Sequence, residues 1–571
     1  MEVTNSNFQE VLCELESVLK NATFLSIDGE FTGLNSGPEA GPFDTPAQYY
    51  GKLRAGSMDF LLVQFGLSVF TYDSETNKYS QRSYNFYVFP KPMNRQAPDS
   101  RFMCQASSIV FLANQDFDFN KLFKHGIPYL CASDEEKLVK RMEEKQKLKE
   151  ENNQDIIPIS DNDRPQIEEI CSRIENFLAS DAKELTIDRC NGFMRRLVYQ
   201  EARARWPNKV RIETKIENTW QCLLVQRAGT KEEEEGKDNE KREKEKLEVK
   251  QAVGLSSLLK KIVESEKIIV GHNMLLDLCH IIHQFFTPLP SDYSEFKSLI
   301  HGLFPNLLDT KVICQSHQFK ELVSSSNLNF LLETLSKPPF SIPEIESVEG
   351  RSYSVSTEKS HEAGYDAYIT GLCFIAMSNY LGSENATVLA NSPLLNSFLN
   401  KLPIARLKDF PYINLVGKDP NPSREHVFHL TFPKEWKHSD ISQLFSPFGG
   451  GFISWLSDTS AYVGLYRRDQ ANAVMTNLSK GKFYNIQKYA NHQATLQANV
   501  SSEERKRKLS SSQNVDVKDD EKSTARNGVK APKDNDDWQV ATGKKRKKRK
   551  EQQATTVAED KKAFEENDAW E

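Results

Sequence analysis

The stretch Phe24-Leu25-Ser26-Ile27-Asp28-Gly29-Glu30-Phe31 carries the main prediction about the fold of this chain. Apolar residues lead into two carboxylates that stand two positions apart, as in a buried strand with an acidic end. Side chains at positions i and i+2 of a strand point to the same face, so Asp28 and Glu30 would project together. Two such carboxylates repel each other unless a cation lies between them, and their hard oxygens favour Mg²⁺ or Mn²⁺. The alternative is a strand that simply runs into an acidic turn, since charged residues at strand ends are common.

The composition limits the class of protein. With 571 residues, of which 38% are hydrophobic and 27% charged, the chain is long enough for two to four domains. The net charge of −6 gives no overall basic character, so nucleic-acid binding would depend on local patches. The 9 cysteines form no Cys-x-x-Cys pair, which argues against a zinc module and for a reducing intracellular compartment. We find no signal-peptide pattern and no membrane-spanning apolar run.

Residues 1–140 predict the first part of an α/β domain. We expect an amphipathic helix at 8–19, strands within 58–72 and 83–89, and short helices at 107–112 and 117–123. A loop rich in Gly and Pro is expected over 33–50. Successive strands beside a helix predict a mixed sheet covered by helices.

Residues 141–250 predict an inserted small α/β domain with its core at about 164–228. Charged segments at 135–153 and 231–250 frame this region as linkers or solvated helices. The distance in sequence from Glu30 to the next distinctive acid, Asp277, exceeds a strand-to-helix step within one domain. We therefore expect the first domain to resume over 251–390.

Residues 424–492 have the βαββαβ order of a ferredoxin-like domain. From 495 to 571 the chain is rich in Ser, Lys, Asp and Glu, which predicts a disordered tail. The basic run at 544–550 is typical of a nuclear-localisation or nucleic-acid patch, and a solvated tail is an equal alternative.

Asp277, His361 and Asp366 join the two strand acids in a recognisable order. Asp277 lies on an otherwise apolar helix, where an unpaired acid is unfavourable, and His361 precedes Asp366 by five positions at the start of a later helix. Four carboxylates could hold two metal ions about 4 Å apart for phosphodiester hydrolysis. A histidine with a pKa near neutrality could take the proton from water. This order is that of the DEDDh-type 3′ exonucleases.

The sequence resembles the poly(A)-specific ribonucleases, a DEDDh-type deadenylase family, over most of 1–130 and 253–385. A further match, Phe432–Lys437, lies in the third unit. Besides the Asp28–Glu30 strand, the matching segments are Met58–Leu62, Asn85–Pro92, Phe117–Lys121, Val270–Asp277 and His361–Tyr368.

The resemblance implies an RNase H-like exonuclease with a C-terminal RNA-recognition-type domain. It implies a Mg²⁺-dependent 3′→5′ exoribonuclease that shortens the poly(A) tails of mRNA, releases AMP and is stimulated by binding of the 5′ cap. Asp28, Glu30, Asp277 and Asp366 would bind two Mg²⁺ ions, for which Mn²⁺ could substitute, and His361 would be the general base. A homodimer in nucleus and cytoplasm, with protein partners for the tail, completes the expectation.

Four further residues are candidate ligand contacts. Phe31 could stack on a terminal base, and Asn273 and Lys311 are candidate RNA contacts. Trp455 is the candidate for the cap, because cation–π stacking favours Trp.

Two segments depart from the family pattern. Neither Arg195 nor Arg196 is followed by His at the Arg-x-x-x-His spacing that names the family's inserted domain, although these arginines, with Arg203 and Arg205, form a basic face. In the third unit only Phe428 and Tyr462 fit the stacking positions for RNA.

Two rival functions stay open. A trimmer of non-coding RNA 3′ ends would use the same chemistry on other substrates. A catalytically silent RNA-binding scaffold would not need all five residues of the constellation.

Overall fold

The computed structural model describes residues 1–92, 100–151, 157–188, 190–207, 209–217, 220–228, 231–353, 359–382 and 390–496. The chain divides into two compact units after Asn421. Of the disordered tail predicted over 495–571, residues 495–496 are helical, and residues 497–571, with the basic run, lie outside the described residues. No helix in the described part of the chain is long and apolar enough to cross a membrane.

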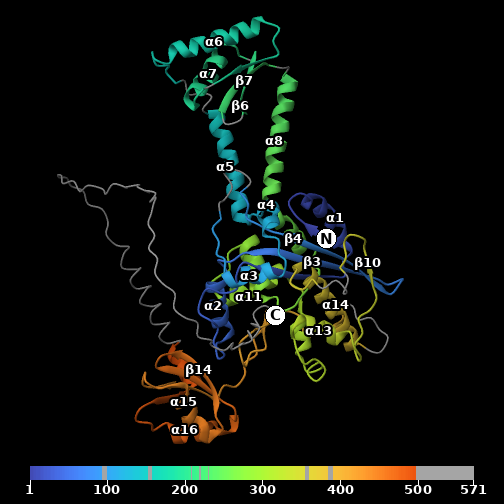
Figure 1. Cartoon of the computed structure of the whole chain (residues 1–571), viewed down its shortest axis with the longest axis vertical. Coiled ribbons are helices and arrows are strands. Elements are labelled where there is room, and N and C mark those ends of the chain that lie inside the picture. The colour runs from blue at the N-terminus through green and yellow to red at the C-terminus, as the bar shows by residue number, and fades with distance from the viewer. Residues whose placement is uncertain are drawn as a thin grey trace, which may run out of the picture. The chain divides into compact units, whose positions relative to one another are not determined.

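A mixed sheet forms the centre of the first unit (Figure 1). Its described strands pair in the order β1-β4-β3-β2-β8-β9. The strand β2 runs antiparallel to β3 and parallel to β8, and β8 is parallel to β9. The short strand β10 (Ile345–Ser347) pairs with β4. The remaining bounds are β1 (Glu2–Val3), β2 (Phe24–Phe31), β3 (Leu62–Asp73), β4 (Lys78–Tyr87), β8 (Ile268–Gly271) and β9 (Leu307–Asp309). The predicted mixed α/β class is confirmed.

Helices cover both faces of this sheet. One core cluster joins β2 to α1 (Phe8–Asn21), α9 (Leu255–Glu264), α10 (Leu275–Ile281), which continues as a π-helical turn over Ile282–Phe286, and α11 (Tyr293–Leu303). A second cluster joins the opposite face to α12 (Thr310–Cys314), α13 (Leu328–Leu335) and α14 (Ala363–Leu381). Residues 363–378 of α14 are all buried, which explains why this helix is apolar around its whole circumference.

The prediction of a loop over 33–50 is wrong at its end, because α2 (Pro46–Ser57) begins there. Thr45 and Gln48 form a capping box at its start, and Pro46 occupies the first turn. These are helix-start signals that the Gly- and Pro-rich composition concealed. The helices α3 (Ala106–Asn114) and α4 (Phe119–His125) occur where short helices were expected.

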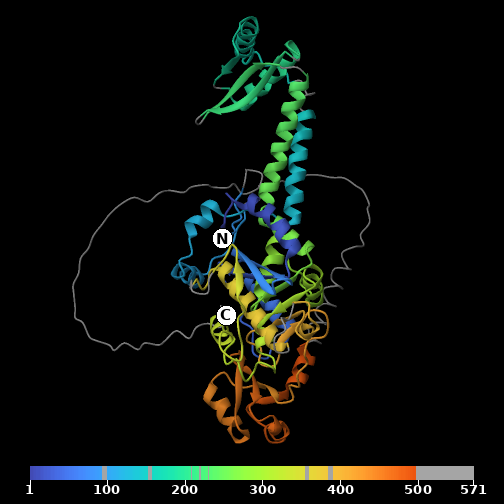
Figure 2. The ribbon, with the colours of Figure 1, turned by 90° about the vertical axis from the view of Figure 1, so that its right-hand side faces the viewer.

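The insertion has its own sheet and core. Its strands β5 (Glu184–Ile187), β7 (Trp220–Arg227) and β6 (Val210–Glu217) pair antiparallel in that order, and α6 (Arg164–Ala179) and α7 (Gly192–Arg205) supply most of its core. The charged segments are the long helices α5 (Ala132–Glu151) and α8 (Lys231–Val253), which lie side by side (Figure 2). Apolar side chains of α5 and α8, Leu138, Met142, Val249 and Ala252, pack together.

The second unit is a four-stranded antiparallel sheet in the order β14-β15-β13-β16 with two helices on one face, as the βαββαβ order predicts. Its elements are β13 (Val427–Thr431), α15 (His438–Phe445), β14 (Gly451–Ser457), β15 (Ser460–Leu465), α16 (Ala471–Leu478) and β16 (Asn485–Lys488). A further helical segment follows β16 over residues 489–496.

Candidate active site

Asp28 and Glu30 lie at the end of β2, which is sandwiched between the two helical layers. Glu30 is 3% exposed, and Asp28 is half-buried. Asp277 on α10 approaches the same strand, and a Cβ built on Gly29 would lie only 2.9 Å from Asp277 Oδ1. Glycine between the two acids therefore makes room for the third carboxylate.

The start of α14 brings Asp366 to the strand. Ser26 Oγ donates to the carbonyl of Ala367 at 2.6 Å, and a Cβ on Gly66 of β3 would lie 1.9 Å from the carbonyl oxygen of Ala363. The side chain of Gln64 accepts the N–H of Ala363 at 2.9 Å, which anchors the first turn. A helix packed this closely on the sheet holds Asp366 in a fixed place beside β2.

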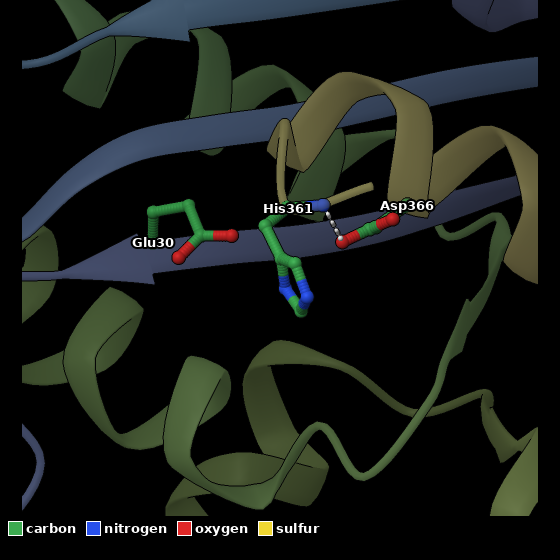
Figure 3. A group of neighbouring side chains, drawn as sticks. All are labelled: Glu30, His361 and Asp366. Atoms are coloured by element: carbon green, nitrogen blue, oxygen red, sulfur yellow. Dashed lines mark hydrogen bonds between the residues drawn. The ribbon is translucent and has the colours of Figure 1, made fainter. Parts of the chain in front are cut away.

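His361 precedes α14 in a left-handed backbone conformation with φ of 66°. Its N–H donates to Asp366 Oδ2 at 3.1 Å, and its ring packs edge-on against Phe111 at 4.8 Å between centroids. Each of Glu30, His361 and Asp366 offers one ligand atom within 4.8 Å of the others (Figure 3). The structure thus brings the five predicted residues of the constellation into one site.

Burial raises the pKa of all four carboxyl groups in the site, and nearby carboxylates add to the shift. Burial raises the pKa of Asp277 and of Asp366 to about 7. The pKa values of Asp28 and Glu30 are raised well above their ordinary values, first by burial and then by the charges of Asp366 and Asp277. Such a group of acids is unfavourable when ionised and without a cation.

The donor set suits a divalent cation with a preference for oxygen. Two buried carboxylate oxygens, Glu30 Oε2 and Asp277 Oδ1, have no hydrogen-bond partner among the described residues. In a buried setting such unsatisfied acceptors are rare unless an ion or water fills the gap. Carboxylate oxygens are the ligands that Mg²⁺ and Mn²⁺ prefer, so the residues present fit these ions.

A further buried carboxylate, that of Asp309, adjoins the site and is not among the residues predicted from the sequence. Gly271 at the end of β8 pairs with Asp309 at the end of β9. The charge of Asp309 contributes to the raised pKa of Asp277. The sequence signal for Asp309 is its position at the end of a strand, because functional side chains gather at the carboxyl ends of adjacent parallel strands.

The three candidate RNA contacts differ in their surroundings. Phe31 is 5% exposed and packs in the core with its ring 4.5 Å from that of His280, so little of it is accessible to a base. Asn273 lies in the turn that follows β8, and Lys311 is the second residue of α12, which follows β9 directly; both are partly exposed. All three roles stay predictions.

The basic face of the inserted domain is partly neutralised. Arg205 forms ion pairs with Glu168 at 2.5 Å and with Glu201 at 2.9 Å. Arg195 donates to the carbonyl of Cys190 at 3.0 Å. The face expected from four arginines is thus less positive than its sequence indicates.

Of the two predicted stacking positions of the C-terminal sheet, Tyr462 lies on the sheet face, whereas the prediction for Phe428 is wrong by one residue. Phe428 is fully buried in the core beneath the helices, so its neighbour His429 faces the other way, opposite Tyr462. The helical segment 489–496 covers both: the ring of His492 stacks on His429 at 3.6 Å, and its Nδ1 lies 2.7 Å from the Tyr462 hydroxyl. This face is therefore occupied by the chain itself.

Trp455 lies on β14 at the edge of the same sheet and is 41% exposed. Its ring meets that of Phe432 edge-to-face at 5.1 Å, and Phe432 stacks on Trp436. One aromatic surface is thus held rigidly while remaining accessible.

Two known domain families and several known proteins are similar to this chain. Residues 3–374 match the profile of the CAF1 family ribonuclease, and residues 417–495 match that of an RNA binding domain. The chain is 42% identical to Poly(A)-specific ribonuclease PARN of Xenopus laevis over 511 residues, covering 86% of this chain and 81% of that protein. It is 43% identical to the Homo sapiens protein of the same name over 517 residues, covering 87% and 81%.

Two more distant similarities were found. Pre-piRNA 3′-exonuclease trimmer of Bombyx mori is 27% identical over 510 residues, covering 86% of this chain and 93% of that protein. The structure of S. pombe Pop2p in its Mg²⁺- and Mn²⁺-bound form aligns at 16% identity with a TM-score of 0.32, covering 69% of this chain and 98% of that chain. From the profile match and the two relatives above 40% identity, this chain belongs to the CAF1 ribonuclease family, among the poly(A)-specific ribonucleases.

Proposed function

We propose that this chain is a Mg²⁺-dependent 3′→5′ exoribonuclease that shortens the poly(A) tails of mRNA and releases AMP. The observation that carries the proposal is the meeting of Asp28, Glu30, Asp277, His361 and Asp366 at the end of one strand, with two buried carboxylate oxygens unpartnered. The similarity to proteins named poly(A)-specific ribonuclease supports the substrate.

The chain's own residues would divide the work between holding cations and moving a proton. Asp28, Glu30, Asp277 and Asp366 would hold two Mg²⁺ ions, which supply an activated water, neutralise charge at phosphorus and stabilise the leaving oxygen. His361 would accept the proton of the attacking water. The hydrogen bond from its backbone to Asp366 and the packing on Phe111 fix the position from which it acts.

Trp455 is our candidate for the methylated base of the 5′ cap. The base carries a positive charge, and a Trp ring is the best cation–π partner among the aromatic side chains. The edge-to-face contact with Phe432 holds the ring, and its 41% exposure leaves surface for a ligand. Cap binding would then stimulate activity on capped mRNA.

The remaining parts of the proposal rest on the family. We expect Mn²⁺ to substitute for Mg²⁺, the enzyme to form a homodimer, and the protein to act in nucleus and cytoplasm with protein partners for its tail. Mass measurement in solution tests the dimer, and a monomer at micromolar concentration would count against it.

The proposal is tested by degrading RNAs that end in A, U or C tracts, labelled at either end, with Mg²⁺ or with EDTA. Asp28→Ala is run beside wild type, with Glu75→Ala as a control because Glu75 is an exposed acid in the turn after β3. We expect stepwise shortening of the A tract only, lost with EDTA and in Asp28→Ala but kept in Glu75→Ala.

Two outcomes would replace the proposal. Equal trimming of all tracts would keep the metal chemistry and favour the trimmer function, which a 27% identical relative carries in its name. Tight binding of oligo(A) without any trimming would favour the scaffold.

A further inference from the structure

Residues 272–274, which follow β8, and residues 310–311, the start of α12 after β9, are here named the two turns, and they lie next to each other beside the active site. The two strands are parallel neighbours, with Gly271 opposite Asp309. The turn after β8 contains Asn273, whose φ is 62°, and leads into the helix that carries Asp277. The strand β9 leads directly into α12, in which Lys311 is the second residue.

One carboxylate connects these two turns. Asp309 Oδ1 accepts the backbone N–H of Asn273 at 3.1 Å and that of Lys311 at 2.9 Å. Asp309 Oδ2 accepts the N–H of Met274 at 3.0 Å. The side chain is fully buried, which raises its pKa to about 6, while the three N–H groups favour its ionised form.

A second link runs through Thr310 and His272. The Thr310 hydroxyl lies 2.9 Å from His272 Nδ1 and 3.0 Å from the carbonyl of Gly271. His272 Nε2 lies 2.8 Å from the carbonyl of Ser326, so the imidazole ties both turns to the segment before α13. The backbone around the start of α10 is thus held from several directions.

We propose that Asp309 is a positioning residue for the reaction, which places two predicted RNA contacts, Asn273 and Lys311, and one predicted cation ligand, Asp277, relative to one another. The inference rests on the proposed function, because it assigns Asp309 a role in that same site. The Asp309 carboxylate accepts backbone N–H groups from both turns. Asp309 thereby couples where the RNA lies to where the cation lies.

The competing explanation is that Asp309 is an ordinary helix cap. Asp292 provides the matched case, since its Oδ1 caps α11 by accepting the N–H of Glu295 at 2.8 Å. Asp292 is exposed and makes its cap bond within its own helix. A residue that only caps a helix should behave as Asp292 does.

The first experiment compares Asp309→Asn with Asp292→Asn. In Asp309→Asn the amide NH₂ must face at least one of the three backbone N–H groups that the carboxylate accepted, so the joined turns shift although the side chain keeps its size. We expect kcat/KM on oligo(A) to fall about 10- to 100-fold, which is the usual loss when a residue that orients metal ligands is substituted. Asp292→Asn should stay within about twofold of wild type.

Three readouts separate positioning from a loss of folded protein. Positioning predicts a higher KM and a lower kcat together, whereas a smaller active fraction lowers kcat with KM unchanged. In an Asp28→Ala background without cations, Asp309→Asn should weaken oligo(A) binding measured by fluorescence anisotropy. Mn²⁺ binding followed by electron paramagnetic resonance should also weaken.

The outcomes for the inference and for the proposed function are distinct. An inactive wild type overturns the proposed function. An active wild type with an unchanged Asp309→Asn variant, or one with only kcat reduced, overturns the role of Asp309. If Asp309→Asn does not fold, Thr310→Val takes its place beside Thr310→Ser, which keeps the hydroxyl. A rise in KM for Thr310→Val alone supports positioning, and equal KM values for the two variants reject it.

Discussion

The carboxylate site and the sheet face of the C-terminal unit differ in how their polar groups are satisfied. At the carboxylate site, Glu30 Oε2 and Asp277 Oδ1 have no hydrogen-bond partner among the described residues, although both are buried. On the sheet face, the Tyr462 hydroxyl pairs with His492 and also accepts a bond from Gln493. The described residues leave two acceptors of the carboxylate site without a hydrogen-bond partner, whereas they supply partners for the Tyr462 hydroxyl on the sheet face.

This difference shows that a motif's residues identify a binding surface only when the fold leaves them unsatisfied. Unpaired buried acceptors are costly, so they persist where a ligand supplies what the protein does not. Stacked rings at 3.6 Å on the sheet face already have the contacts that a base would make. We therefore expect substitutions at the carboxylate site to abolish RNA cleavage. Substitutions that uncover the sheet face should instead strengthen RNA binding.

His361→Ala should produce the largest effect, because it removes the proposed proton acceptor. We expect kcat to fall by about 10²- to 10⁴-fold, the usual contribution of general acid–base catalysis. Binding of oligo(A) should change little, since the four carboxylates remain. Single-turnover cleavage and fluorescence anisotropy measure the two quantities. His317→Ala, at an exposed histidine, is the control. Full activity of His361→Ala would remove the histidine from the mechanism.

The stability of the cation-free protein should depend on pH through the same site. Asp277 and Asp366 have folded pKa values of about 7, above the ordinary 3.8, so the folded state holds protons that the unfolded state has lost. Their stabilising contribution is full below about pH 4 and is lost as the pH rises through 7, at about 1.4 kcal/mol per unit for each group. In EDTA, the free energy of unfolding should therefore decline between pH 5 and 8.

Mg²⁺ should restore the stability that is lost at pH 8, because it binds the folded state alone. Asp28→Asn, which removes one of the repelling charges, should be more stable than wild type in EDTA and gain less from Mg²⁺. Urea unfolding at each pH checks both statements, with Asp292→Asn as the control. An Asp28→Asn variant that is less stable than wild type in EDTA would show that the protein compensates the negative charges of these acids without a cation.

Trp455→Ala should weaken the binding of an m⁷G cap analogue by about 1 to 2 kcal/mol, roughly five- to thirtyfold. Cleavage of uncapped RNA should be unchanged, because the catalytic residues lie in the other unit. Fluorescence quenching with the cap analogue is the measurement. Phe483→Ala is the matched control, since Phe483 is an exposed aromatic residue of the same unit. An equal loss in both variants would mean that the effect is not specific to Trp455.

His492→Ala should have the smallest effect and the opposite sign. Removing the ring that stacks on His429 exposes His429 and Tyr462, so oligo(A) binding in an Asp28→Ala background should rise about two- to fivefold. Thr495→Ala, whose hydroxyl bonds only within the helical segment, serves as the control. Unchanged or weaker binding would show that covering the sheet face does not limit its use for RNA.

The sequence by itself determined the order of the elements and the identity of the acids. The alternation in Phe24–Phe31, the apolar residues around Asp277 and the spacing of His361 and Asp366 are local patterns, and local patterns follow from strand and helix periodicity. The family resemblance then linked segments that are far apart in the chain. The missed start of α2 shows the limit of composition, because a single capping box outweighed a stretch rich in Gly and Pro.

Only the tertiary structure decided which polar side chains have hydrogen-bond partners. The approach of Asp277 over Gly29, the bonds from Asp309 to two separate turns and the cover of residues 489–496 on Tyr462 all join positions distant in sequence. Phe428 and His429 are one residue apart, and no local pattern states which of them faces the core. Pairing in the sheet fixes that choice, because a shift of one residue exchanges the two faces of a strand.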